Sequence, residues 1–185
     1  SNGLSQLQNE FRYLSSLKHP HLVQVFNFGT EKDLYFFTME LVEGSDLLTA
    51  ASAASFEEKL DMIAQLCRAL EYIHQNDIIH LDLKPSNVLF SAQDKQVKLT
   101  DFGLCQSAKN HSLLRTSGTP AYMSPEVISG QMPDGRADLY SLGVILYQLF
   151  TGRQPFECGS TEELIKSHLF KAPQPPRVYN DKIPE

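Results

Sequence analysis

The sequence predicts an α+β fold in which a small part that contains strands, residues 1–42, precedes a larger and mainly helical part, residues 43–185. Two segments rich in β-branched and aromatic residues lie in the first part, whereas apolar side chains at helical spacing dominate the second. The chain has 185 residues, of which 42% are hydrophobic, and this is enough to build a sizeable core.

The first predicted elements are a helix and a β-hairpin. Leucine and phenylalanine recur every three or four residues over residues 4–17, which predicts an amphipathic helix. Residues 22–28 and 34–41 are predicted strands, and the glycine-containing segment 29–33 is the predicted turn between them. Over residues 39–44 the chain leaves the sheet.

A long helix and three short strands are predicted next. Ser55 and Glu58 form the S-x-x-E pattern of a capping box, so we expect a helix from there to about Gln75. Its apolar residues share one face and predict burial on that side. Three short apolar segments after this helix are predicted strands: residues 78–79, 88–90 and 97–99.

The C-terminal half combines a polar loop with two helices. Residues 101–126 are predicted to be a loop, and long loops inside compact domains commonly serve a function. Residues 138–152 are apolar on almost every side, which predicts a buried helix. A second capping box, Ser160 with Glu163, predicts a helix that ends near Phe170, and the prolines after it predict extended chain.

Charge and cysteine content argue against several classes of function. The net charge is −6 and no cluster of lysine or arginine is present, which argues against nucleic acid and anionic membranes as main partners. The longest apolar run, residues 139–150, is too short to span a bilayer. The 3 cysteines lie far apart without C-x-x-C spacing, so we expect a cytoplasmic, reducing location and no zinc site.

Four polar side chains suited to phosphoryl transfer lie close together in the sequence. Asp82, Lys84 and Asn87 share a loop in which Pro85 prevents a helix, and Asp101 comes after the last predicted strand. A carboxylate can orient a hydroxyl and accept its proton, a lysine can neutralise a phosphate, and an amide with a carboxylate can hold Mg²⁺. The pattern therefore predicts Asp82 as base, Lys84 as cation, and Asn87 and Asp101 as metal ligands.

Residues 80–87, H-L-D-L-K-P-S-N, and 101–103, D-F-G, resemble the catalytic loop and metal-binding turn of the protein kinases, H-R-D-L-x-x-x-N and D-F-G. The S-P-E of residues 124–126 is similar to the family's A-P-E. The resemblance implies a protein-kinase-like fold. Residues 1–42 would be a partial N-lobe with helix C, two strands and the hinge, and residues 43–185 a C-lobe that ends before its last helices.

The resemblance also implies a function, the transfer of the γ-phosphoryl group of ATP to a protein hydroxyl with Mg²⁺, or Mn²⁺, as the metal. In Ser/Thr kinases the residue that matches Thr119 hydrogen-bonds the catalytic aspartate and lysine, so a Ser/Thr acceptor is expected and Thr119 joins the catalytic set. Main-chain groups of Glu40 and Val42 would bind adenine, with Leu89 beneath the base. The implied nucleotide-binding residues are Glu40, Val42, Lys84, Asn87, Leu89 and Asp101.

Four further positions take roles from the resemblance. Asp138 would anchor the catalytic loop from below, whereas by itself it is a helix-start aspartate. His80 would be structural and would transfer no proton. Met39 would be the gatekeeper behind the adenine, although a methionine there is by default a core residue, and Glu10 would pair with the family's strand-three lysine.

The sequence also departs from the family. Leu81 replaces the arginine that in most members receives the activation-loop phosphate. No glycine-rich loop or strand-three lysine precedes Glu10, and no arginine follows to pair with Glu126, so we expect a fragment that is inactive alone and marginally stable. The alternative is a pseudokinase or interaction module, which the presence of all four chemical residues disfavours. The segment 118–126 disfavours a small-molecule kinase.

Overall fold

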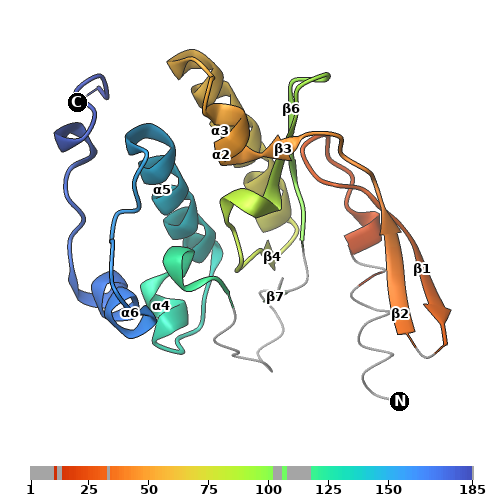
Figure 1. Ribbon diagram of the computed structural model, residues 1–185. Helices are drawn as coiled ribbons and strands as arrows, with labels where there is room; N and C mark the ends of the chain where they lie inside the picture. The colour runs from red at the N-terminus through yellow and green to blue at the C-terminus, as the bar shows by residue number, and fades with distance from the viewer. Residues whose placement is uncertain (1–10, 12–13, 33, 102–105, 108–117, 185) are drawn as a thin grey trace.

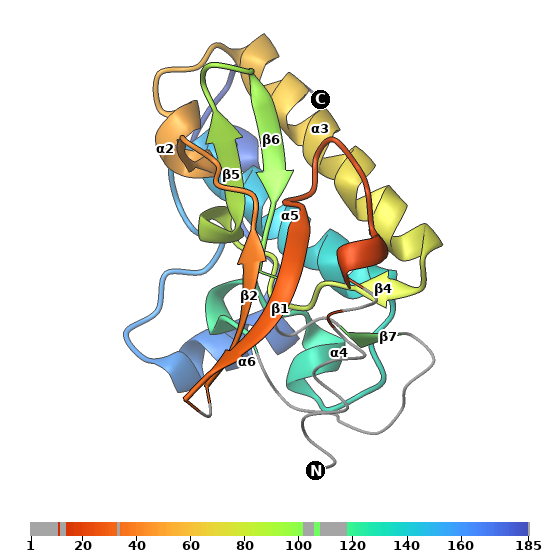
Figure 2. The same cartoon turned by 90° about the vertical axis from the view of Figure 1, so that its right-hand side faces the viewer.

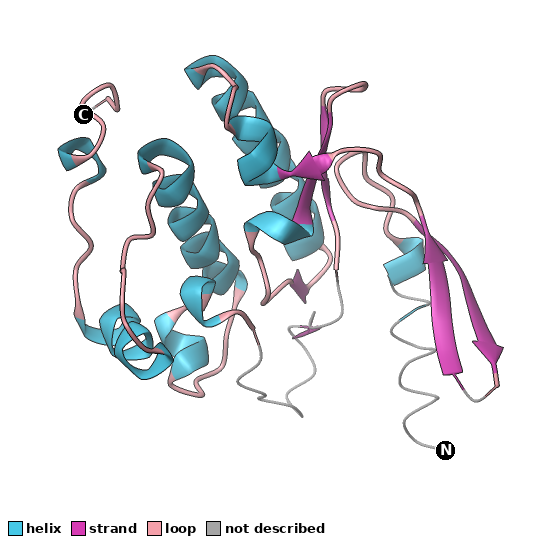
Figure 3. Ribbon diagram, in the orientation of Figure 1, coloured by secondary structure: helices cyan, strands magenta, loops and turns pink. Residues whose placement is uncertain are grey.

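The computed structural model describes residues 11, 14–32, 34–101, 106–107 and 118–184. They form a mixed α+β fold of helices and small antiparallel sheets, as predicted (Figures 1 and 3). The strands are β1 (Val25–Glu31), β2 (Leu34–Met39), β3 (Ser45–Asp46), β4 (Ile78–Ile79), β5 (Val88–Ser91), β6 (Gln96–Leu99) and β7 (Gln106–Ser107). The helices are α2 (Leu47–Ala51), α3 (Phe56–Gln75), α4 (Pro125–Ile128), α5 (Gly135–Thr151) and α6 (Thr161–Phe170), with 3₁₀ turns η1 (Pro85–Asn87), η3 (Pro120–Tyr122) and η4 (Pro176–Val178).

Strands β1 and β2 form the predicted hairpin, which extends away from the helical body in Figure 1 and lies in front of it in Figure 2. The predicted turn is wrong in length, because β1 continues to Glu31, which pairs with Leu34. Lys32 adopts a φ of 47°, the left-handed backbone that closes a tight hairpin. Gly29 is therefore a strand residue, and a Cβ there would come within 2.6 Å of the Phe36 ring.

The start of the predicted first strand pairs with another sheet. Leu22 bridges Leu99 in parallel, and the backbone N–H of Val23 donates to the Leu99 carbonyl at 3.0 Å. Leu99 belongs to β6 of the sheet ordered β3-β5-β6, whose strand β3 was not predicted. This bridge fastens the hairpin part to the rest of the chain. The division at residue 42 into two parts stays a prediction.

The two long helices begin at side-chain caps. The capping box of α3 is confirmed, since Ser55 Oγ accepts from Glu58 N at 3.2 Å and Glu58 Oε2 accepts from Ser55 N at 2.8 Å. Helix α5 starts at Gly135, three residues earlier than predicted, because Asp134 accepts from the Arg136 N–H at 2.9 Å and serves as N-cap. Asp138 consequently lies in the first turn.

The core lies between α3, α5 and the sheet β3-β5-β6. Its fully buried side chains include Leu66, Ile73, Val88, Leu99 and Ile145. The prediction that α5 is buried on almost every side is wrong at Leu139, which is 54% exposed. Helices α2 and α4 are too short to show a helical period and were not predicted. None of the helices in the described residues is both long and apolar enough to cross a membrane.

Candidate active site

The predicted catalytic loop runs from β4 to β5, between the sheet and helix α5. Pro85 begins the 3₁₀ turn η1, whose last residue is Asn87, so the chain bends back immediately after Lys84. Asp82 and Asn87 are 8% and 5% exposed, which fixes both side chains in the folded chain. The turn thus brings the Asp82, Lys84 and Asn87 side chains close together.

Asp82 receives hydrogen bonds on both carboxylate oxygens. Lys84 Nζ lies 2.7 Å from Oδ2, and the Asn87 amide Nδ2 donates to the same oxygen at 3.3 Å. On Oδ1 the Thr119 backbone N–H donates at 2.9 Å and the Thr119 hydroxyl at 3.0 Å. Lys84 Nζ also donates to the Thr119 hydroxyl at 3.1 Å. The structure therefore brings Asp82, Lys84, Asn87 and Thr119 into one network, and Thr119 reaches it from 37 residues away.

Asn87 and Asp101 offer oxygens of the kind that Mg²⁺ prefers. Both hydrogen bonds of the Asn87 side chain in the described residues come from Nδ2, so Oδ1 is left to act as a ligand. The Asp101 side chain is exposed, and its φ of 63° lies in the left-handed region that is rare for non-glycine residues. Among the described residues, no three or more histidine, cysteine, aspartate or glutamate side chains form a cluster that could bind a metal. A metal ion here would therefore need the amide oxygen of Asn87.

His80 is completely buried and connects the catalytic loop to the residue before Asp101. Its Nδ1 accepts from the Asp82 N–H at 3.4 Å, so Nε2 carries the hydrogen and donates to the Thr100 carbonyl at 3.0 Å. The Thr100 N–H in turn donates to the Asn87 carbonyl at 2.9 Å. These contacts give His80 a structural role and leave neither ring nitrogen free for proton transfer.

Asp138 holds the catalytic loop from below, as the resemblance implies. Its Oδ2 accepts from the His80 N–H and its Oδ1 from the Leu81 N–H, both at 2.9 Å. Leu81 has a φ of 64°, so the two hydrogen bonds act where the backbone is strained. A third donor, which the sequence did not reveal, is His74 Nε2 at 2.7 Å from Oδ2.

Close backbone approach explains two glycines near this site. A Cβ on Gly118, whose φ is 139°, would lie 3.1 Å from the Leu81 carbonyl oxygen. A Cβ on Gly135 would lie 3.0 Å from Nδ1 of His74 and press on the ring that contacts Asp138. Larger residues at these positions would displace the catalytic loop or its anchor.

The predicted hinge, residues 39–44, is held by an ion pair that the sequence did not reveal. Lys98 Nζ of β6 lies 2.8 Å from Glu40 Oε1, and the Glu40 N–H donates to the Gln24 carbonyl at 2.8 Å. The side chain and the backbone N–H of Glu40 are therefore both engaged within the protein, and the main-chain role expected for Glu40 toward a ligand stays a prediction. Half-buried Leu89 pairs with Lys98 across the sheet, and Val42 in the hinge is also half-buried.

Met39 departs from the expectation for a core methionine, because 43% of it is exposed. All six residues of β2 are exposed, so the described residues leave both faces of this strand uncovered. Glu10, Phe102 and Gly103 lie outside the described residues, and the predictions for them stay predictions.

The segment after Gly118 packs on α5 through Tyr122. The Ser141 hydroxyl donates to the Tyr122 carbonyl at 2.7 Å, and the Tyr122 hydroxyl donates to Gln148 Oε1 at 2.8 Å. Burial raises the pKa of Tyr122, and the hydrogen bond from Gln154 at 3.1 Å opposes that shift. The segment that carries Thr119 is thus fixed to the same helix that carries Asp138.

Comparison with known proteins identifies the family. Residues 1–184 match the protein kinase domain. The chain is 32% identical to the serine/threonine-protein kinase PrkC of Bacillus subtilis over 188 residues, which cover 98% of this chain and 29% of PrkC. It is 37% identical to the serine/threonine-protein kinase PknJ of Mycobacterium bovis over 180 residues, 92% of this chain and 30% of PknJ.

A eukaryotic relative shows similar identity. Calcium/calmodulin-dependent protein kinase type 1 of Caenorhabditis briggsae is 37% identical over 156 residues, which cover 81% of this chain and 44% of that kinase. The chain spans less than half the length of each of these three relatives.

Proposed function

The chain belongs to the protein kinase domain family, and from that premise we propose that it takes part in transferring the γ-phosphoryl group of ATP to serine or threonine hydroxyls of a protein. The observation that carries the proposal is the network around Asp82, in which Lys84 lies 2.7 Å from one oxygen and Thr119 donates twice to the other. Such a carboxylate is oriented before a substrate arrives, which is how a positioned base assists transfer.

Each residue of the network has a distinct proposed role. Asp82 orients the acceptor hydroxyl and takes its proton, and Lys84 neutralises charge on the phosphate that is being transferred. Asn87 Oδ1 and the Asp101 carboxylate would hold Mg²⁺, which when bound neutralises charge on the ATP phosphates. Thr119 positions Asp82 and Lys84 through its hydroxyl.

The nucleotide site is proposed at the hinge. Main-chain groups of Glu40 and Val42 would bind the adenine, and Leu89 would lie beneath it. The Glu40–Lys98 ion pair supports this role by fixing the hinge to β6. The protein substrate remains an inference from the family. The cytoplasmic location likewise stays a prediction from cysteine content.

The test is a phosphorylation assay on the full-length protein that contains this chain, with Mg²⁺·ATP and a generic serine- and threonine-containing protein. Asp82→Asn keeps the shape of the side chain but removes the base, so transfer should fall by ~10²-fold or more. Ser86→Ala, an exposed position in the same loop, is the matched control and should leave the rate within about twofold.

Two results would contradict the proposal. An Asp82→Asn protein that keeps its rate within about a factor of two would show that the assigned base is wrong. A full-length wild-type protein that is folded but transfers no phosphate would favour the pseudokinase alternative.

A further inference from the structure

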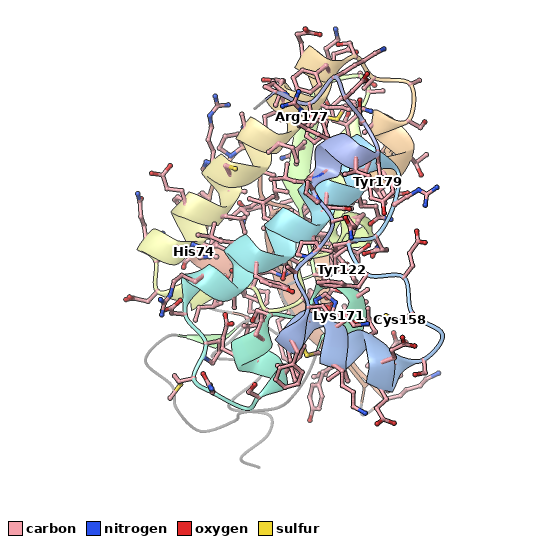
Figure 4. All side chains as sticks on the ribbon, turned by 90° about the vertical axis from the view of Figure 1, so that its left-hand side faces the viewer. His74, Tyr122, Cys158, Lys171, Arg177 and Tyr179 are labelled. Carbon is pink, nitrogen blue, oxygen red and sulfur yellow. The ribbon has the colours of Figure 1, made fainter. Side chains whose placement is uncertain are left out.

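The chain between α6 and η4 is an exposed, proline-rich segment. We call residues 171–177, Lys-Ala-Pro-Gln-Pro-Pro-Arg, the proline strap. Residues 171–175 are all exposed and belong to no helix or strand, and Pro176 is half-buried where it starts η4. In Figure 4 the strap runs from Lys171 beside α6 to Arg177, along the outer side of α5.

The backbone of the strap is extended. Lys171 has φ −107° and ψ 142°, and Pro175, with φ −55° and ψ 131°, is close to the polyproline II conformation. Each proline fixes its own φ and disfavours a helical conformation of the residue before it. Since Ala172, Gln174 and Pro175 each precede a proline, the sequence itself holds most of the strap in this conformation.

Contacts at both ends hold the strap in place. At its start the Lys171 N–H donates to the Ser167 carbonyl at 2.9 Å. Beyond its end the Tyr179 ring lies 5.0 Å from the Arg153 guanidinium and 6.5 Å from the Tyr147 ring of α5. One residue further on, the Asn180 side chain donates to the Phe150 carbonyl at 2.8 Å, so a partner would meet an ordered segment and lose less entropy on binding.

The chemistry of the strap fits one class of partner. Three prolines have no N–H, so the segment is poorly suited to pairing with a sheet edge. Residues 171–175 are exposed, whereas the carbonyls of Pro175 and Pro176 accept backbone hydrogen bonds from the turn that follows. Ala172-Pro173 and Pro175-Pro176 flank Gln174 and form the P-x-x-P pattern that aromatic-lined grooves bind. Lys171 and Arg177 add positive charge at both ends of the strap, in a chain whose net charge is −6.

We propose that the proline strap is a docking site for a domain of the SH3 class, whose aromatic groove takes the two X-Pro pairs and whose acidic rim faces Lys171 and Arg177. The docking would leave the site around Asp82 unchanged, because the strap lies beyond α6 on the outer side of α5. The proposal does not depend on phosphoryl transfer by this chain.

The experiment measures binding of the 185-residue chain to an array of purified SH3 domains, with WW and EVH1 domains beside them. We expect at least one SH3 domain to bind, and Pro173→Ala/Pro175→Ala to weaken that binding at least tenfold. Pro184→Ala removes an exposed proline outside the strap and should bind as the wild type does. Tyr179→Ala releases one end of the strap and should weaken binding a few-fold without altering a proposed contact residue.

Thermal unfolding of every variant separates lost binding from lost folding. The strap variants should unfold at the wild-type temperature, because residues 173 and 175 are exposed. The proposal is overturned if no SH3 domain retains the wild-type chain above the level of the double proline variant. Binding by WW or EVH1 domains alone would also overturn the assignment to the SH3 class.

Discussion

Replacing Asp138 by asparagine should destabilise the folded chain more than any exposed aspartate can. The Asp138 carboxylate is 1% exposed and accepts from the backbone N–H groups of His80 and Leu81 and from His74. His80 and His74 donate to one oxygen and Leu81 to the other, so an amide can satisfy only one side. Its NH₂ group would then face a buried donor.

The magnitude follows from those contacts. A hydrogen bond to a charged group contributes about 1.5–3 kcal/mol, and leaving a buried N–H unpaired costs about 1–3 kcal/mol more. We therefore expect Asp138→Asn to lower the free energy of unfolding by about 3–5 kcal/mol, a large share of a typical ~5–15 kcal/mol. For a chain of this size that is a fall in Tm of about 10 °C.

The assay is thermal unfolding followed by far-ultraviolet circular dichroism, with Asp134→Asn as matched control. Asp134 caps the same helix, its side chain is 55% exposed, and its ion pair is with the 85%-exposed Arg136. Asparagine caps helices as well as aspartate does, and an exposed ion pair contributes about 0–1 kcal/mol, so Tm should change by about 4 °C or less. Equal Tm values for Asp138→Asn and Asp134→Asn would refute the anchoring role.

Two further predictions concern buried polar groups. Ser124 is 1% exposed and its hydroxyl has no hydrogen-bond partner in the described residues, so Ser124→Ala should raise Tm by about 2–4 °C. Ser167→Ala is the control that should lower Tm, because the Ser167 hydroxyl donates to the Glu163 carbonyl at 2.9 Å. A lower Tm for Ser124→Ala than for Ser167→Ala would contradict this prediction. Burial lowers the pKa of His168, so on acidification this histidine takes up a proton in the unfolded chain before it does so in the folded chain. The free energy of unfolding should therefore fall as pH drops below about 6.5, by at most ~1.4 kcal/mol per pH unit for this group. Urea unfolding at several pH values checks this prediction, and His168→Gln should reduce the change in the free energy of unfolding with pH. If the variant shows the same pH dependence as the wild type, other groups cause it and the prediction is wrong.

Local chemistry let the sequence predict much of this protein. The helix start at Ser55 was predictable because a capping box needs only residues three apart. The grouping of Asp82, Lys84 and Asn87 was predictable for the same reason, since Pro85 forces a turn within the loop. The fold class also followed, because apolar periodicity distinguishes helices from strands without knowledge of their neighbours.

Other outcomes depended on which segments meet. The length of the hairpin turn was wrongly predicted, because glycine is typical both of turns and of strand positions that an aromatic side chain covers. Here the ring of Phe36 lies close to Gly29. The default interpretation of Met39 as a core residue was wrong, because burial depends on what packs against a strand, and β2 is exposed throughout. The gatekeeper role that the resemblance implies for Met39 stays a prediction. Neither error could be corrected from the local sequence.

Only the tertiary structure decided the supports of the site. His74 reaches Asp138 across 64 residues because α3 and α5 pack together, and Lys98 reaches Glu40 across 58 because β6 runs beside the hinge. In the sequence His74 is an ordinary residue of a helix's last turn, and Lys98 is an ordinary charge on a short strand. A hydrogen bond between distant residues requires two backbones to come within a few ångströms, and that distance is set by the packing of whole elements, which no local pattern encodes.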